Sequence, residues 1–346
     1  MRSVTAYATA GPKEPFRRTT IERRDLGPTD VLIKIAFAGI CHSDIHTARA
    51  EWGEVIFPLV PGHEISGTVE EIGSRVKKHA VGDRVGVGCL VDSCRGCENC
   101  LAGHQQYCLN GPIWTYNGVG KDGRPTEGGY SSHIVVDQDF VLHIPAGLEL
   151  EVAAPLLCAG ITLYSPLKRW GVGPGSSVAI VGLGGLGHMG VKIAHALGAE
   201  VTVLSQTLAK QDDGRRFGAD HYFATGDHST FDKLKNSLGL IVSTVSASLP
   251  IDSYLSMLRL DGAMVNVGAP PDGLRVSPFA LMTNRRSFAG STIGGIRETQ
   301  EMLDFCAEHS LGAEIEVIGG DQIDQAYDRV VNSEVRYRFV IDTASF

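Results

Sequence analysis

The chain has 346 residues, which is more than one hydrophobic core usually serves, so we expect two domains. Hydrophobic residues make up 43% of the chain and charged residues 20%, a composition typical of globular rather than disordered proteins. The net charge of −8 is unlike that of proteins that bind a phosphate backbone, so we expect no nucleic-acid partner.

The N-terminal segment lacks the apolar core of a signal peptide, because charged residues interrupt it at Lys13, Glu14, Arg17 and Arg18. The most apolar stretch, residues 178–199, contains six glycines, which favours a glycine-rich cofactor turn over a membrane span. We therefore expect a cytoplasmic protein with no membrane partner, whose eight cysteines stay reduced unless a metal binds them.

Short β-branched runs at residues 31–35 and 65–72, bounded by Gly, Pro and Asp, predict a β-rich first half with long loops. The pattern then changes: residues 177–182 are predicted as a buried strand, 185–197 as a helix and 200–204 as a second strand. This succession is a βαβ unit.

The alternation continues with strands predicted at 240–244 and 264–268 and a helix at 251–260 between them, as in a doubly wound parallel sheet. Residues 297–309 are predicted as a further helix, with acids early and His309 late. We assign residues 1–153 and 294–346 to a discontinuous first domain and 154–293 to a cofactor domain.

Four cysteines in the first half have the spacing Cys-x2-Cys-x2-Cys-x7-Cys: Cys94, Cys97, Cys100 and Cys108. Thiolates packed so closely suit one tetrahedral zinc ion, and four protein ligands make that ion structural rather than catalytic. Two disulfides or an iron–sulfur cluster are the alternatives.

Thiolate, imidazole and carboxylate groups also occur at Cys41, His63, Glu64 and Cys158. Cys158 alone would more often be a small buried apolar residue than a ligand. Two cysteines and one histidine nevertheless match the ligand set of a catalytic zinc that keeps an open fourth position.

A dinucleotide-binding pattern follows the strand predicted at 177–182: Gly182, Gly184, Gly185, Leu186 and Gly187 form Gly-x-Gly-Gly-Leu-Gly before a helix. NAD-selective sites usually place an acid about 20 residues further on, where this chain has Ser205. The neutral and cationic donors Ser205, Gln206, Thr207 and Lys210 suit a 2′-phosphate, so we predict NADP(H) over NAD.

Several motifs together resemble the zinc-dependent medium-chain alcohol dehydrogenases, almost end to end. They are Gly39–Asp44, Pro61–Glu64, the four-cysteine run and the glycine motif. Residues 113–117, 128–130, 157–162 and 187–190 look like the cinnamyl-alcohol-dehydrogenase branch, which typically reduces aldehydes with NADPH. The resemblance implies an α/β protein with a GroES-like β-rich catalytic domain and a Rossmann cofactor domain.

The resemblance also implies roles for residues of the site. Catalytic zinc would bind Cys41, His63 and Cys158, with Glu64 able to approach the metal. Asp44 would orient His63, and Ser43 would begin a proton relay to His46. Other histidines, namely His42, His79, His104, His133 and His143, are interpreted as surface residues.

The same resemblance places further residues at the ligands. The nicotinamide or its ribose would contact Thr162, Val267, Gly268 and Ile293, for which core or strand-end packing is the alternative. Thr244 and Ser291 are also assigned to cofactor binding. Walls of a pocket for an aromatic or medium-length apolar aldehyde would include Trp52, Cys89 and Trp114, for which ordinary packing is the alternative. Residues 281–295 match the family segment that approaches a second subunit, so we expect a homodimer.

The resulting hypothesis is an NADP-dependent zinc alcohol dehydrogenase that interconverts primary alcohols and aldehydes. A polyol or secondary-alcohol dehydrogenase on the same scaffold, and a non-enzymatic module that binds zinc and NADP, are the rival hypotheses. Turnover of a sugar alcohol would favour the first rival, and absent turnover in zinc-replete protein would favour the second.

Overall fold

A computed structural model describes residues 1–270 and 272–346. The chain divides into two compact units, one formed by residues 1–161 and 294–346 and the other by residues 162–293. The predicted domain boundary after residue 153 remains a prediction. The boundary between the two compact units lies after residue 161, within the helix α4 (Ala159–Arg169).

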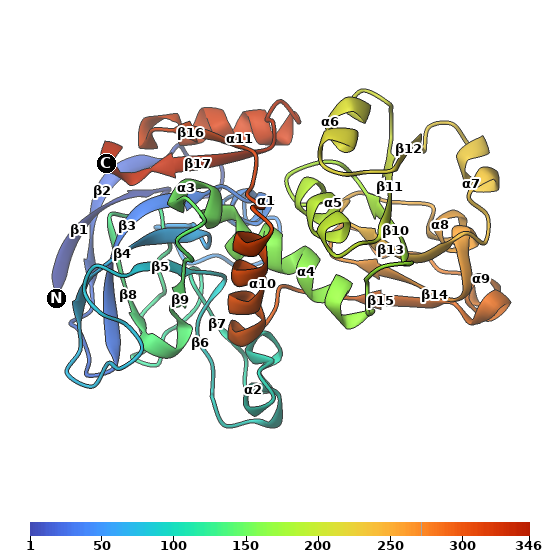
Figure 1. The fold of residues 1–346 in the computed structure, drawn as a ribbon. Helices are drawn as coiled ribbons and strands as arrows, with labels where there is room; N and C mark the ends of the chain where they lie inside the picture. The colour runs from blue at the N-terminus through green and yellow to red at the C-terminus, as the bar shows by residue number, and fades with distance from the viewer. Residues whose placement is uncertain (271) are drawn as a thin grey trace. The chain divides into compact units, whose positions relative to one another are not determined.

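The first unit is mainly β-structure, with short helices in its connections (Figure 1). Its strands are β1 (Arg2–Ala8), β2 (Arg17–Arg23), β3 (Asp30–Gly39), β4 (Ile65–Ile72), β5 (Arg84–Val87), β6 (Leu90–Asp92), β7 (Ile113–Trp114), β8 (His133–Asp137), β9 (Leu142–His143), β16 (Ile315–Ile318) and β17 (Arg338–Asp342). Its helices are α1 (His42–Ala48), α2 (Glu98–Leu101), α3 (Leu150–Ala153), α10 (Ile296–Glu308) and α11 (Ile323–Val331), with short 3-10 turns between elements.

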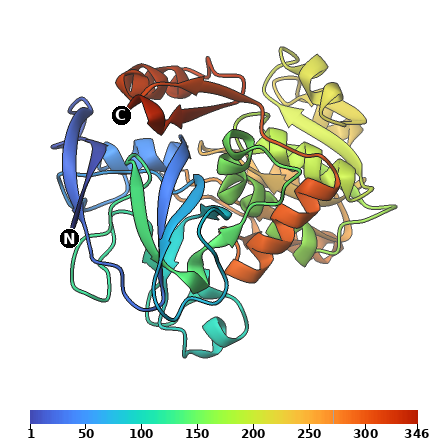
Figure 2. The ribbon, with the colours of Figure 1, turned by 60° about the vertical axis from the view of Figure 1, so that its left-hand side comes forward.

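One seven-stranded sheet organises this unit, in the order β16-β17-β3-β4-β5-β9, with β8 also paired to β3. The last strand of the chain, β17, lies antiparallel beside β3, so segments about 300 residues apart share one sheet (Figure 2). A buried core that includes Tyr130 and Phe339 joins these two parts of the sequence. The predicted strand at 65–72 is found with those bounds, and the one at 31–35 is longer.

The second unit has a six-stranded sheet in the order β12-β11-β10-β13-β14-β15, with every pairing parallel. The strands are β10 (Ser177–Val181), β11 (Glu200–Ser205), β12 (His221–Ala224), β13 (Leu238–Ser243), β14 (Leu258–Asn266) and β15 (Ser287–Gly290). The helices are α5 (Gly187–Ala196), α6 (Gln211–Arg216), α7 (Ser229–Lys233), α8 (Ile251–Met257) and α9 (Pro278–Met282).

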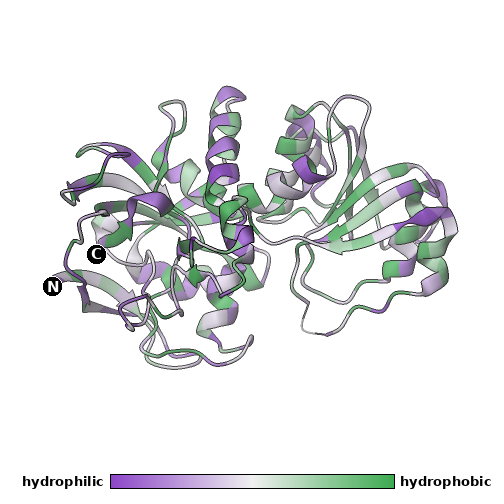
Figure 3. Cartoon of the chain, turned by 90° about the horizontal axis from the view of Figure 1, so that it is seen from below, coloured by the Kyte–Doolittle hydropathy of each residue, from purple (hydrophilic) through white to green (hydrophobic). Residues whose placement is uncertain are grey.

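In sequence order this is strand order 3-2-1-4-5-6, the Rossmann arrangement. The central strands contain the continuous apolar runs Val178–Val181 and Leu240–Val242, as expected of a parallel sheet that helices cover on both faces. In Figure 3 the strands of this unit carry much of the hydrophobic colouring. The predicted α/β fold class, with its Rossmann sheet, is therefore confirmed.

One predicted helix, residues 251–260, is too long. α8 ends at Met257, and Leu258 begins β14, where it pairs with Leu238. Apolar Leu258 and Leu260 fit both a helical and an alternating pattern, and pairing with β13 decides between them. The helix predicted to begin at Gly185 begins instead at Gly187, after the glycine turn.

Two residues of the first unit flank the point where the second unit is inserted. A Cβ atom added to Gly294 would lie 2.6 Å from Ile161 Cδ1, so the chain leaves the first unit and returns to it at neighbouring positions. Across residues 1–270 and 272–346, no single helix has the length and apolar composition of a membrane span, although one bent pair, residues 150–157 with 159–169, meets those criteria.

Candidate functional site

Four buried residues from distant parts of the first unit bring their ligand atoms within 4.8 Å of one another: Cys41, His63, Glu64 and Cys158. Cys41 precedes α1, His63 and Glu64 precede β4, and Cys158 lies between a 3-10 turn and α4. These are the residues that the sequence predicts as the catalytic zinc set.

The donor set fits a tetrahedral zinc ion. Cys41 Sγ and Cys158 Sγ lie 3.9 Å apart. Two thiolates each about 2.3 Å from one zinc would be about 3.8 Å apart at the tetrahedral angle. The pKa of Cys41 is held well below its usual value, first by its contact with Cys158 and then, against burial, by His63, as a ligand thiolate requires.

Asp44 links both halves of this set. Its carboxylate accepts hydrogen bonds from His63 Nδ1 at 3.0 Å, the Cys41 peptide N–H at 2.8 Å and the Gly62 peptide N–H at 3.2 Å. His63 therefore keeps its proton on Nδ1 and leaves Nε2 as the ligand atom. Asp44 occupies the position that the resemblance gives it.

Glu64 is fully buried, and its Oε1 pairs with the guanidinium of Arg338, at the start of β17. Its Oε2 has no hydrogen-bond partner among the described residues. Burial raises the pKa of Glu64 to about 7, against the lowering effect of Arg338. The ion pair thus holds only one of the two carboxylate oxygens.

The predicted relay residues lie on the first turns of α1. Ser43 Oγ is 3.6 Å from Cys41 Sγ. His46 Nδ1 lies 2.5 Å from Glu51 Oε2, whereas its Nε2 is buried with no partner among the described residues. The His46 ring stacks on Trp52 at 4.7 Å between centroids.

The predicted pocket residues have partly open surfaces. Trp52 is 50% exposed and Trp114 40%, so neither indole is simply a core residue, and Cys89 is intermediate. Cys89 and Trp114 lie at neighbouring positions, since Thr115 N donates to the Cys89 carbonyl. Substrate contact for all three remains a prediction.

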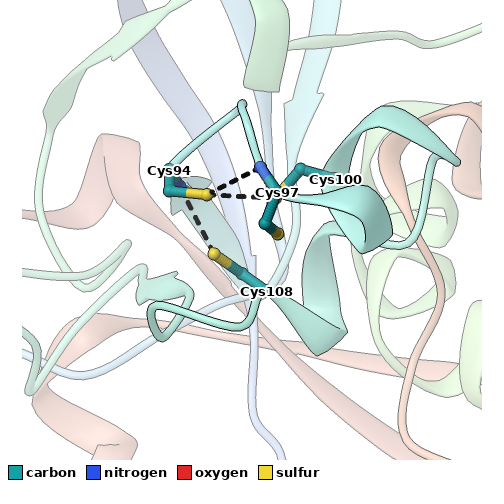
Figure 4. Close-up of side chains that lie close together, drawn as sticks. All are labelled: Cys94, Cys97, Cys100 and Cys108. Carbon is teal, nitrogen blue, oxygen red and sulfur yellow. Dashed lines mark hydrogen bonds between the residues drawn. The ribbon is translucent and has the colours of Figure 1, made fainter.

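The four-cysteine run forms a second cluster, in the loop between β6 and β7 (Figure 4). None of the eight cysteines forms a disulfide bond, which excludes the disulfide alternative. Cys94 Sγ and Cys100 Sγ are 3.9 Å apart, and peptide N–H groups of Cys97 and Leu109 point to the sulfurs of Cys94 and Cys97 at 3.3 and 3.4 Å. Such N–H groups, first that of Gly96, lower the pKa of Cys94 to about 6.

This cluster fits one tetrahedral ion. All four sulfurs lie within 4.8 Å of one another, which suits a single zinc better than a wider iron–sulfur cluster. Four protein ligands leave no coordination position for a substrate, as expected for a structural site.

The predicted cofactor residues gather at the carboxyl edge of the parallel sheet in the second unit. Gly182 follows β10, Ser205 ends β11, Thr244 follows β13, Val267 and Gly268 follow β14, and Ser291 follows β15. Because the strands are parallel, these positions share one edge, and the strand order reverses between the neighbouring strands β10 and β13, which is the switch point. Thr162 lies on α4, and Ile293 is buried with φ +33°.

The glycine motif is shaped by close backbone contact. Gly182 has φ +91°, and a Cβ on Gly187 would lie 1.8 Å from the Gly182 carbonyl oxygen. Gly184 faces open space, where a pyrophosphate could approach the start of α5. Leu186 lies at the N-cap of that helix.

The predicted 2′-phosphate segment follows β11 directly. Lys210 Nζ donates to the Leu183 carbonyl at 3.1 Å, which holds its ammonium beside the glycine turn. Gln206 and Thr207 are exposed, and Thr207 Oγ1 accepts from Ala209 N at 3.4 Å. No carboxylate occurs from residue 205 to 211.

Sequence reasoning missed three residues around the catalytic cluster. Arg338 pairs with Glu64 across 274 positions of sequence, and no local pattern marks it. Tyr130 OH lies 3.4 Å from Asp44 Oδ2, and Tyr327 OH lies 3.3 Å from Tyr130 OH. Tyr130 lies in a motif of the resemblance, but nothing in that motif indicated its contact with Asp44.

Comparison with known proteins agrees with this arrangement. Residues 27–146 match the family model of the alcohol dehydrogenase GroES-like domain, and residues 185–308 match that of the zinc-binding dehydrogenases. The chain is 60% identical to NADP-dependent alcohol dehydrogenase C 1 of Mycolicibacterium smegmatis over 346 residues, covering 100% of this chain and 99% of the relative.

Solved structures give the same result. A cinnamyl alcohol dehydrogenase from Sorghum bicolor superposes with a TM-score of 0.96 at 43% identity, covering 99% and 98% of the two chains. The Helicobacter pylori cinnamyl alcohol dehydrogenase, solved with NADP(H), gives 0.94 at 42% identity and covers 99% of each chain. The chain therefore belongs to the zinc-binding, GroES-like alcohol dehydrogenase family.

Proposed function

We propose that this chain is an NADP(H)-dependent zinc alcohol dehydrogenase that interconverts primary alcohols and aldehydes, with aromatic or medium-length apolar substrates. The observation that carries the proposal is the assembly of Cys41, His63, Glu64 and Cys158 around one point in a protein of this family. The M. smegmatis relative is named NADP-dependent, and the H. pylori structure contains NADP(H).

Cys41, His63 and Cys158 would hold the catalytic zinc, and Cys94, Cys97, Cys100 and Cys108 would hold the structural one. When bound at the catalytic position, zinc supplies a Lewis acid for the substrate oxygen. Bound NADPH would supply the hydride for the aldehyde carbon, and the chain's own residues would supply the proton for its oxygen.

The chain's own residues support each requirement. Asp44 fixes the tautomer and orientation of His63 through the 3.0 Å bond to Nδ1. Ser43 and His46 would deliver the proton: His46 Nδ1 contacts Glu51 Oε2, while its buried Nε2 has no hydrogen-bond partner among the described residues. Arg338 keeps one oxygen of Glu64 occupied, so this acid does not turn away from the cluster.

Cofactor selectivity is proposed to depend on the end of β11. Ser205, Gln206, Thr207 and Lys210 offer hydroxyl, amide and ammonium donors without a carboxylate that would repel a 2′-phosphate. Two charge-assisted hydrogen bonds of about 1.5–3 kcal/mol each would give a preference of about a hundredfold or more.

We further propose a homodimer in the cytoplasm. β15 is the edge strand of the six-stranded sheet, and the adjacent α9 exposes Phe279 (76%) and Met282 (70%). An edge strand beside exposed apolar side chains is a surface that a second copy can cover. Light scattering coupled to size exclusion measures this, and a monomer at micromolar concentration would contradict it. The eight cysteines form no disulfide bond, which suits a reducing compartment.

The central test is the initial rate of NADPH oxidation with cinnamaldehyde in zinc-replete protein, run beside NADH at matched concentrations. We expect a fast rate that is selective for NADPH. The variant Cys158→Ser removes one ligand of the catalytic cluster, so it should lose NADPH oxidation while it keeps the zinc bound by the four-cysteine cluster. Turnover of sorbitol but not of aldehydes would indicate a polyol dehydrogenase, and no turnover at full zinc occupancy would indicate a binding module.

A further inference from the structure

A third cluster of ligand-type side chains lies in the first unit and shares no residue with either predicted zinc site. Its members are His79, Asp83 and His143, whose ligand atoms all lie within 4.8 Å of one another. The sequence interpretation of His79 as a surface histidine is wrong, because the side chain is only 6% exposed.

The sheet places these residues together. His79 and Asp83 lie in the turn that leads into β5, and Asp83 N donates to the Ala80 carbonyl at 3.1 Å to close that turn. His143 lies on β9, the edge strand beside β5, where it pairs with Val85. Residues about sixty positions apart therefore meet at one sheet edge.

Backbone contacts determine which nitrogen of each ring is available. His143 Nε2 lies 3.0 Å from the Lys78 carbonyl oxygen, and His79 Nε2 lies 3.4 Å from the Gln138 carbonyl oxygen. A carbonyl only accepts, so each Nε2 carries the proton, and a neutral ring then has its lone pair on Nδ1. Backbone carbonyls anchor the far nitrogen of metal-bound histidines in the same way.

The lone pair of His79 Nδ1 is the unusual feature of this cluster. The atom is buried and has no hydrogen-bond partner among the described residues. The two rings are 4.4 Å apart between centroids, at 35°. A buried acceptor without a partner is costly, and such atoms in native proteins call for an unseen water or ion.

We propose that His79 Nδ1, His143 Nδ1 and an oxygen of Asp83 bind one divalent transition-metal ion. Two imidazoles and one carboxylate suit zinc, copper or nickel and supply too few oxygens for calcium or magnesium. His143 is exposed, which gives the ion a path from solvent. The nearby Lys78 ammonium is paired with Asp139 at 2.7 Å, so its charge is compensated.

A bound ion would cross-link the turn at residues 79–83 to the edge strand β9. Neither of the two predicted zinc sites links these two segments. Because three protein ligands leave a position for water, the ion should exchange more readily than one held by four cysteines.

The test is an isothermal titration calorimetry experiment, in which Zn²⁺ is added to protein whose two predicted zinc sites are already filled. We expect one further equivalent per chain. His143→Ala and Asp83→Asn should each raise its dissociation constant at least about tenfold, or about 1.4 kcal/mol. Both side chains are at least partly exposed, so the variants should fold.

His133→Ala is the matched control, because His133 is a partly exposed histidine that pairs with Glu70 at 3.1 Å and belongs to no metal-ligand cluster of the described residues. It should bind the further equivalent as the unaltered protein does. Absence of a further equivalent would overturn the proposal. Binding that survives His143→Ala, or that is lost equally in His133→Ala, would overturn it too, since the ion would then lie elsewhere.

Discussion

Replacement of Asp44 by Asn should weaken zinc at the catalytic cluster and leave the four-cysteine site unchanged. Asp44 Oδ1 accepts from His63 Nδ1 and Gly62 N, and Oδ2 faces Cys41 N and Tyr130 OH. Asparagine retains one oxygen. If that oxygen takes the Oδ1 position, the asparagine NH2 group takes the Oδ2 position and faces the Cys41 N–H. Two donors then face each other, and the buried Cys41 N–H is left unsatisfied at a cost of about 1–3 kcal/mol.

The loss falls on two ligands at once, because Asp44 positions both Cys41 and His63. Removal of a single such supporting group usually costs about 10–100-fold in metal affinity, so we expect the zinc dissociation constant to rise by at least that range. Each tenfold change corresponds to about 1.4 kcal/mol.

A competition titration with a chromophoric zinc chelator resolves the two classes of zinc. Asp30→Asn is the matched control: Asp30 is a buried carboxylate of the same unit that accepts from Gly27 N at 2.7 Å and from Arg24 Nη2 at 2.9 Å, and both of these partners lie outside the two clusters. Unchanged affinity at the catalytic cluster in Asp44→Asn would refute the reasoning. Equal loss at both clusters would show general unfolding instead.

Three further predictions concern the cofactor segment, the glycine turn and pH. Ser205→Asp should lower kcat/KM for NADPH about a hundredfold and raise it for NADH, measured under matched conditions; an unchanged ratio would contradict the proposed phosphate segment. Gly187→Ala should lower Tm sharply, since its Cβ would lie 1.8 Å from the Gly182 carbonyl oxygen, whereas Gly184→Ala, in open space, should fold normally and raise the KM for the cofactor; equal Tm values would contradict this. Burial lowers the pKa of His79, so as the pH falls the unfolded chain takes up this proton at a higher pH than the folded chain does. Without added metal, the free energy of unfolding should therefore decrease as the pH drops below about 6.5. Denaturant titrations of His79→Gln should show a weaker dependence on pH.

Much of the fold could be predicted because its signals are local. The glycine motif between a strand and a helix, and the apolar runs of β10 and β13, indicate the parallel sheet from a few residues each. The end of α8 could not be predicted in this way, since Leu258 joins a strand only because Leu238 lies beside it.

The candidate site divides along the same line. Ligand types and spacings identify the four-cysteine loop by themselves, but Cys41, His63 and Cys158 required the family resemblance before they could be grouped. Arg338 had no signal of either kind, because its role exists only after β17 returns beside β3. The burial of His79 likewise depends on the sheet edge and not on its neighbours in sequence.

Because Ile161 and Gly294 lie side by side, residues 162–293 form an insert whose two ends leave the first unit at the same place. Domain insertions are tolerated where the two ends of the insert lie close together. Every predicted metal ligand belongs to the host and every predicted cofactor residue to the insert. Coenzyme choice in this protein should therefore be exchangeable as a cassette, spliced at residues 161 and 294, with the metal chemistry carried over intact.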